Sequence, residues 1–307
     1  MEAVKEQNES EPTLVAPEVK KSGGRLEFLD AIRGIASFIV LIQHYVEQHF
    51  RSFAIEANNY ISLGRAGVVT FFVVSGFVIP MSIERRGDLR AFSIARVFRL
   101  YPAYLLSMTS LVICYFVLRG PTEASGMLGG AKLPDDWRTW LVNFSLLQFF
   151  FQGKIPGVRF DAENINPVAW TLGVEWMIYI GCAALFWMKG LKKMWVVAAA
   201  AFAVGFLPAL YRPWKVGASG PYVEPMLIWY AVIGLAIYRV LHNETDKKTG
   251  VFWSVVMVGL VGGALYFNRI LHFPVAPAEF TATWVTEVNS ALLAFGIFMG
   301  GVALRAK

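Results

Sequence analysis

Residues 26–50, LEFLDAIRGIASFIVLIQHYVEQHF, form the stretch that decides the fold. Most of it is apolar over the length that a membrane-spanning helix requires. It nevertheless holds ionisable residues, which are costly in hydrocarbon: Asp30, Arg33, His44 and Glu47. His44 follows Arg33 by about three helical turns, so both lie on one face, roughly 16 Å apart along the axis. Charged groups on one face of a membrane helix need a polar cavity or partners, so this stretch predicts a functional site.

The composition of the chain predicts a membrane protein. The 307 residues are 56% hydrophobic and only 16% charged, whereas a soluble domain carries about 25% charged residues. The mean hydropathy is +0.50, and apolar runs of about 20 residues recur without the alternation of a membrane barrel. The two cysteines fall inside predicted spans and indicate neither a disulfide framework nor a metal site. The basic residues lie beside spans and do not indicate nucleic-acid binding.

The expected class is all-α, a polytopic transmembrane helical bundle of about eight spans. The predicted spans are 28–50, 64–83, 92–118, 167–188, 194–210, 223–241, 251–268 and 284–304. A long external segment, 119–166, separates the third span from the fourth. Its stretch 140–151, WLVNFSLLQFFF, is apolar but too short to cross the bilayer, and predicts a re-entrant or interfacial helix.

Residues 1–24 are polar and predict a disordered tail ahead of a transmembrane domain at 25–307. The Lys and Arg residues gather mainly in the segments that would lie on the same side of the membrane as this tail. Because cytoplasmic loops carry the excess of Lys and Arg, we expect a cytoplasmic N-terminus and a multi-pass position in the inner (plasma) membrane.

Two further arginines lie near the cytoplasmic start of the third predicted span. Arg96 and Arg99 are one helical turn apart on one face, and like Arg33 they fall roughly 6–10 Å from the inner ends of their helices. Guanidinium groups match phosphates in charge and geometry, so the three arginines predict a site for a phosphate-bearing cofactor. The alternative is that Arg96 and Arg99 are anchors that touch lipid phosphates.

A histidine and a carboxylate define a second predicted half-site. His44 lies about 9 Å from the outer end of its span and Glu175 about 12 Å from the outer end of the fourth, so we expect both at similar depth. A carboxylate near a histidine orients the imidazole, which is a general-base arrangement. The alternatives are a neutral His44 bonded to a neighbouring backbone and a protonated Glu175 that packs between helices.

Four segments, in this order, resemble a known family. RLEFLDAIRGIASFIVLIQHY at 25–45 contains an Arg-x10-His pair in Arg33 and His44, and GRAGVVTFFVVSGFVIP follows at 64–80. FSIARVFRLYPAYLLS contains an Arg-x-x-Arg-hydrophobic-Tyr-Pro motif, and NFSLLQ followed by VAWTLGVEWMIYI contains a Trp-Thr/Ser-Leu-x-Val-Glu segment. Together they resemble the integral-membrane acyltransferase 3 family over residues 25–181.

The resemblance implies transfer of an acyl group, usually acetyl, from acyl-CoA to a hydroxyl of a cell-surface or exported carbohydrate such as lipopolysaccharide or exopolysaccharide. It also implies about ten spans and no metal. His44 would be the general base, and Glu175 would orient it or bind the acceptor. Arg33, Arg96 and Arg99 would bind the phosphates of acyl-CoA.

The chain departs from the family pattern at two places. Val69 stands where many members carry an acidic residue, so a role of that carboxylate does not transfer to this chain. Many members also end with a helical pair that contains a Ser-Tyr-x-x-Tyr-Leu-x-His motif, which does not occur before Lys307. We therefore expect a shortened or truncated form of the domain, and an inactive scaffold stays open as an alternative to the enzyme.

A transporter or flippase of a glycan-linked or anionic solute is the other alternative function. It would use the same polar helix face as a substrate path. The sequence shows no internal repeat, which argues against the inverted-repeat architecture of many transporters.

Overall fold

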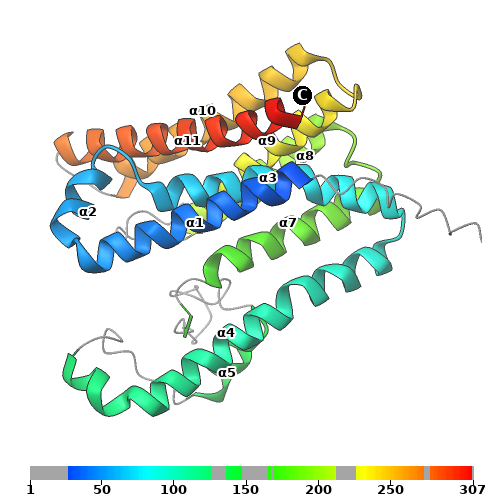
Figure 1. The fold of residues 1–307 in the computed structure, drawn as a ribbon. Helices are drawn as coiled ribbons and strands as arrows, with labels where there is room; N and C mark the ends of the chain where they lie inside the picture. The colour runs from blue at the N-terminus through cyan, green and yellow to red at the C-terminus, as the bar shows by residue number, and fades with distance from the viewer. Residues whose placement is uncertain are drawn as a thin grey trace, which may run out of the picture.

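The computed structural model describes residues 27–125, 136–146, 165–166, 169–211, 226–272 and 277–305. Within these ranges the chain is helical and contains no strand, which confirms the all-α class (Figure 1). The helices are α1 Glu27–His49, α2 Arg51–Asn58, α3 Leu63–Arg86, α4 Leu89–Ser125, α5 Trp137–Phe144, α7 Trp170–Trp187, α8 Met194–Tyr211, α9 Leu227–Leu241, α10 Lys247–His272 and α11 Pro277–Arg305. The predicted tail, 1–24, lies outside the described residues.

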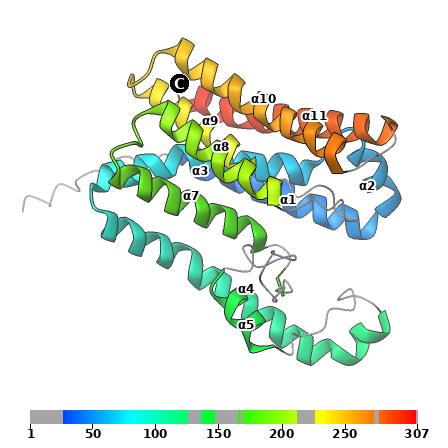
Figure 2. The ribbon, with the colours of Figure 1, turned by 180° about the vertical axis from the view of Figure 1, so that it is seen from behind.

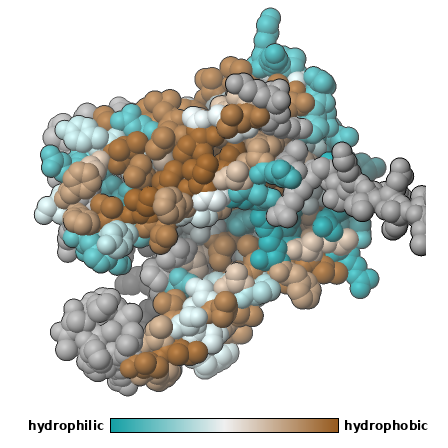
Figure 3. Space-filling model, viewed as in Figure 1, coloured by the Kyte–Doolittle hydropathy of each residue, from teal (hydrophilic) through white to brown (hydrophobic). Residues whose placement is uncertain are grey.

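Each predicted span falls on one of the longer helices, which confirms a polytopic membrane bundle. By length and composition, five helices of the described part can cross a membrane, namely α1, α3, α4, α7 and α11. The apolar stretches of α8 and α9 are shorter. The count of eight spans therefore stays a prediction. On the face seen in Figure 3, hydrophobic residues dominate the middle, over α1 and α11, and hydrophilic residues gather toward the ends.

The segment between the third and fourth predicted spans is only partly described. α4 continues to Ser125, beyond the predicted end at residue 118. The predicted interfacial helix at 140–151 overlaps α5, and its residues after 146 lie outside the described part. α5 begins at an Asp136 cap, whose carboxylate accepts a hydrogen bond from the Arg138 amide.

Helices α3 and α9 form the centre of the bundle, and their backbones touch. A Cβ placed on Gly76 would lie 1.8 Å from the carbonyl oxygen of Ala231, and one placed on Gly234 would lie 1.9 Å from that of Val73. Small residues allow such close approach between membrane helices. Residues 226–236 are all buried, so this part of α9 is surrounded by protein (Figure 2).

Helix α1 packs on α3 and α11 along a narrow stripe. Its buried residues are Leu29, Ile32, Ala36 and Gln43. A Cβ on Gly67 of α3 would meet the Val40 side chain of α1 at 2.6 Å, and one on Gly301 of α11 would meet Ile32 at 2.5 Å. Glycines thus set the close approach of α1 to both neighbours.

Ion pairs join helices near both ends of the bundle. At one end, Arg239 of α9 binds Glu84 of α3 with nitrogen–oxygen distances of 2.5 and 2.9 Å, and it also pairs with Glu244. At the other end, Arg65 of α3 pairs with Glu287 of α11 at 3.0 Å. These pairs join segments that are far apart in the sequence.

Helix α4 diverges from the other helices toward its C-terminal end (Figures 1 and 2). Its first part contacts α3 and α7. Further along, Tyr104 and Met108 pack with Leu146 in a second, smaller hydrophobic cluster. The Tyr104 hydroxyl donates a 2.5 Å hydrogen bond to the carbonyl oxygen of Asn143, which holds α5 against α4.

Candidate active site

The Arg33–His44 face of α1 is present as the helical spacing predicts. α1 is one unbroken helix from Glu27 to His49, so the two side chains share a face and lie roughly 16 Å apart along its axis. Arg33 is half-buried and His44 is exposed. The residues of α1 that face outward, such as Phe38 and Leu41, are 62% and 64% exposed, as expected for side chains in contact with lipid.

The structure brings the three predicted arginines together beside α7. Arg96 is 6% exposed, and its guanidinium lies over the rings of Phe92 and Tyr179, 5.1 and 5.3 Å from their centroids. Arg33 interacts electrostatically with Arg99, and so does Arg96. Two helices therefore contribute three guanidinium groups to one region, called the arginine cluster below.

Helix α7 contributes a carboxylate and a phenol to the arginine cluster. The hydroxyl of Tyr179 donates a hydrogen bond to Glu175, one helical turn earlier. Glu175 interacts electrostatically with Arg33 and Arg96, and Asp30 also lies near Arg33. Three guanidinium groups beside two carboxylates leave an excess of positive charge.

One guanidinium nitrogen of the arginine cluster lacks a hydrogen-bond acceptor among the described residues. The Nε atom of Arg96 is buried and has no hydrogen-bond partner in the described part of the chain. A buried donor without an acceptor costs about 1–3 kcal/mol, so an oxygen-rich anion that reached Arg96 would remove a penalty as well as add attraction. The cluster is therefore suited to binding phosphate.

Glu175 does not lie against His44, which corrects the expected pairing. Among the described residues, the carboxylate that pairs with His44 is Glu47, with 3.6 Å between Nδ1 and Oε2. The depth count failed because α7 begins part-way along α1 (Figure 1), so a residue near its start already lies beside Arg33. Counting residues from a helix end assumes that all helices begin at the same level.

A polar cluster near the C-terminal end of α1 was not assigned a role from the sequence. Gln43 and Asn58 both donate hydrogen bonds to Oε1 of Glu47, at 2.6 and 3.3 Å. The amide of Leu63 donates to Oε1 of Gln43 at 3.2 Å. The spacing of Gln43, His44 and Glu47 on one helix could have indicated part of this cluster, but Asn58 comes from α2, a helix that the span pattern does not predict.

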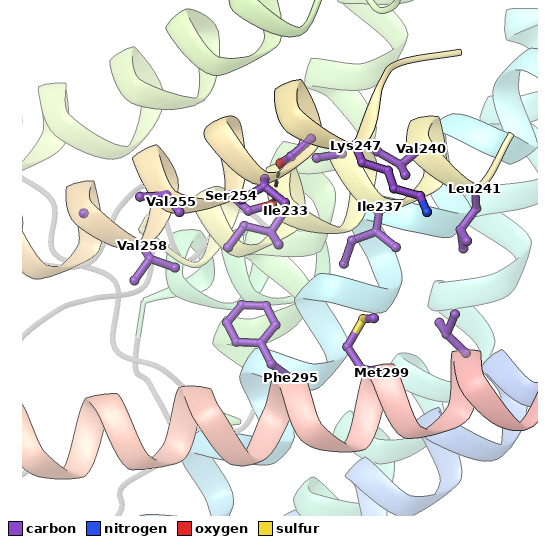
Figure 4. Close-up of a pocket in the computed structure, with 15 residues that line it drawn as sticks. Ile233, Ile237, Val240, Leu241, Lys247, Ser254, Val255, Val258, Phe295 and Met299 are labelled. Carbon is purple, nitrogen blue, oxygen red and sulfur yellow. Dashed lines mark hydrogen bonds between the residues drawn. The ribbon is translucent and has the colours of Figure 1, made fainter. Parts of the chain in front are cut away.

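A large apolar cavity lies elsewhere, between α9, α10 and α11 (Figure 4). Its volume is about 740 Å³, and its walls include Ile233, Phe295 and Met299. Lys247, at the start of α10, is the charged residue in its lining. The cavity includes neither His44 nor an arginine of the cluster, so it suits hydrocarbon rather than the reacting groups.

Comparisons with known proteins identify a family and two relatives. A family model described as an acyltransferase domain matches residues 26–307. The chain is 23% identical over 292 residues to the acyltransferase MdmB of Streptomyces mycarofaciens, covering 88% of this chain and 69% of that relative. It is 26% identical over 119 residues to nodulation protein 10 of Rhizobium leguminosarum bv. viciae, covering 37% of this chain and 31% of that relative. No solved structure matches the chain.

The family model covers nearly the whole chain, and its match begins with α1, the helix that carries Arg33 and His44. The protein therefore belongs to the acyltransferase 3 family.

Proposed function

We propose that this membrane acyltransferase moves an acyl group, with acetyl as the expected group, from acyl-CoA to a hydroxyl of a cell-surface or exported carbohydrate. Family membership supports the acyltransferase activity. The observation that carries the choice of donor is the arginine cluster, formed by Arg33 of α1 and by Arg96 and Arg99 of α4. Arg33 lies on the α1 face that also presents His44.

The donor binds through its phosphates in this proposal. Arginine holds phosphate oxygens through paired N–H groups, and the buried Nε of Arg96 adds a donor that has no other partner in the described part. If the protein lies in the inner membrane with its N-terminus in the cytoplasm, the cluster lies in the cytoplasmic half of the bilayer. Acyl-CoA is supplied from that side.

His44 is the proposed general base. It takes the proton from the acceptor hydroxyl as that oxygen attacks the thioester carbonyl carbon. The new carbon–oxygen bond forms, the carbon–sulfur bond breaks, and the departing thiolate of CoA takes the proton back from His44. The products are the acylated carbohydrate and CoA, and the base is regenerated.

The separation of the two groups supports this division of roles. Arg33 and His44 lie roughly 16 Å apart along α1, a distance that matches an extended pantetheine arm better than a direct contact. The phosphates would then rest at the arginine cluster while the thioester reaches His44 near the outer end of α1.

Labelled acyl-CoA provides the test. Purified protein in phospholipid vesicles is given acetyl-CoA with a radiolabelled acetyl group and a cell-envelope glycan extract, and label in the glycan is measured together with release of free thiol. The wild type should transfer label. His44→Ala should abolish transfer while retaining binding of acetyl-CoA.

Two results would overturn the proposal. Wild-type transfer by the His44→Ala protein would show that another group is the base. Absence of acyl-CoA binding by the folded wild type would exclude the proposed donor. Mass spectrometry of surface glycans, from cells with and without the gene, then identifies the acceptor by a mass difference of one acyl unit.

A further inference from the structure

We propose that Glu47 is the positioning residue that orients His44 for proton transfer, a role that rests on the proposed function of His44 as the base. The two residues lie one helical turn apart on α1, with 3.6 Å between His44 Nδ1 and Glu47 Oε2. Their side chains are 57% and 38% exposed, so the histidine is accessible while the carboxylate is partly covered.

The two oxygens of Glu47 have different surroundings. Oε1 accepts hydrogen bonds from Gln43 Nε2 at 2.6 Å and from Asn58 Nδ2 at 3.3 Å. Oε2 is the oxygen that faces His44. The amide groups of two helices therefore fix the carboxylate through one oxygen and leave the other for the imidazole.

The supporting side chains are themselves held in place. Gln43 is 8% exposed, and its Oε1 accepts a hydrogen bond from the Leu63 amide at the start of α3. Gln43 also donates to Asn58 Oδ1 at 3.1 Å. Because α1, α2 and α3 all contribute, the position of Glu47 is set by the fold and does not depend on one flexible side chain.

This arrangement decides which ring nitrogen of His44 reacts. A carboxylate on the Nδ1 side favours the tautomer with its proton on Nδ1, which leaves Nε2 as the acceptor for the substrate proton. The 3.6 Å separation is longer than a hydrogen bond. Catalytic hydrogen bonds are often long before substrate binds and shorten in the reactive complex.

Glu175 is less suited to this role because its carboxylate is engaged elsewhere. It accepts a hydrogen bond from Tyr179 and interacts with Arg33 and Arg96. The structure thus gives the two carboxylates different neighbours, with Glu175 at the arginine cluster and Glu47 at the histidine.

Steady-state kinetics on the full chain in vesicles tests the role of Glu47. Glu47→Gln keeps the size of the side chain and removes its charge. It should lower kcat by about 10–100-fold, which is less than the roughly 10²–10⁴-fold that the positioned base itself supplies. KM for acetyl-CoA should change by less than about twofold, because Glu47 lies away from the arginine cluster. Glu47→Asp, which keeps the charge, should retain more activity than Glu47→Gln.

Matched controls separate positioning from stability. Glu56→Gln removes an exposed carboxylate from α2, the helix that also holds Asn58, and should leave kcat at the wild-type value. The thermal unfolding midpoint of each variant is measured alongside the rates.

Three outcomes would overturn the positioning role. One is a Glu47→Gln protein with wild-type kcat, and another is equal loss in Glu47→Gln and Glu47→Asp. The third concerns stability and uses Asn58→Ala, which removes a hydrogen bond to Glu47, for comparison. If Glu47→Gln and Asn58→Ala lower both kcat and the unfolding midpoint to the same degree, the loss of activity follows from lower stability. If His44→Ala abolishes transfer and Glu47→Gln does not affect it, the proposed function stands and only the role of Glu47 fails. If the wild type transfers no acyl group, both fail.

Discussion

Gly76 of α3 and Gly234 of α9 lie where two helix backbones meet at the centre of the bundle. A methyl group on either glycine would come within 2 Å of a carbonyl oxygen of the other helix, at 1.8 Å for Gly76 and 1.9 Å for Gly234. Backbone atoms cannot turn aside as a side chain can, so the helices would have to separate.

Alanine at position 76 or 234 should therefore destabilise the folded protein. Overpacking a tight contact costs about 1–3 kcal/mol and sometimes more, and the upper part of this range is expected here. The fraction that elutes as a monodisperse species after heating in detergent measures the effect. Gly259→Ala is the matched control, since a Cβ there meets nothing within 4 Å. Equal heat resistance of Gly76→Ala and Gly259→Ala would contradict the close contact.

Arg96 should contribute to acyl-CoA affinity in a way that lysine cannot replace. Its guanidinium stacks on Phe92 and Tyr179 while its buried Nε points to no partner in the described part. A hydrogen bond to a charged group contributes about 1.5–3 kcal/mol, so Arg96→Ala should weaken binding roughly 10–100-fold. Arg96→Lys should recover little, because an ammonium group lacks the planar fork.

Calorimetry with a non-hydrolysable acyl-CoA analogue measures this affinity. Arg86→Ala removes an exposed arginine from the end of α3 and serves as the control. If Arg96→Ala and Arg86→Ala bind the analogue equally well, the arginines of α4 act as lipid anchors instead.

The two carboxylates that bind Arg239 should differ in their importance. Glu84 is 14% exposed and receives two hydrogen bonds from Arg239, whereas Glu244 is 38% exposed. Removing one partner of a buried pair costs about 3–5 kcal/mol because it leaves the other charge uncompensated. More exposed pairs contribute about 0–1 kcal/mol. Glu84→Gln should therefore lower the unfolding midpoint far more than Glu244→Gln, and the reverse order would refute this ranking.

The first turn of α10 should loosen in acid. Asp246 caps this helix by accepting a hydrogen bond from the Thr249 amide at 3.0 Å. Hydrogen bonds from Thr249 hold the pKa of Asp246 below its ordinary value of 3.8. The cap therefore stabilises the helix fully above that value, and its contribution is lost as the pH falls through the lower pKa of the folded state.

Hydrogen exchange of the Thr249 amide checks this effect. Protection should be constant from neutral pH to about pH 5 and should fall at lower pH, after correction for intrinsic exchange rates. Asp246→Asn keeps a capping group without a titrating charge. An equal loss of protection in Asp246→Asn would assign the acid effect to another group.

Local patterns in the sequence account for much of the fold and for part of the site. Apolar runs located the long helices, and the helical period placed Arg33 and His44 on one face of α1. The pair Arg96 and Arg99 followed from the same reasoning. These features depend on one helix at a time, so they can be read without knowledge of the neighbours.

The remaining features depend on how helices are placed against each other. Glu175 was expected beside His44 because each helix was assumed to begin at the membrane surface, but α7 begins part-way along α1 (Figure 1). The hydrogen bond from Asn58 to Glu47 depends on α2, the short helix between α1 and α3, which hydrophobic periodicity does not predict. Contacts of this kind depend on the packing of several helices and are not encoded in the pattern of any single one.

The burial of α9 bears on how the chain is assembled during synthesis. Helices α1 to α8 are made before α9, and α10 and α11 follow it. α9 carries Arg239, whose partner Glu84 belongs to the earlier helix α3, and a guanidinium alone in lipid is costly. The lowest-energy route is for α9 to contact α3 as it passes from the insertion machinery into the bilayer. Assembly would then add α9 to helices that have already associated, and α9 would not insert independently.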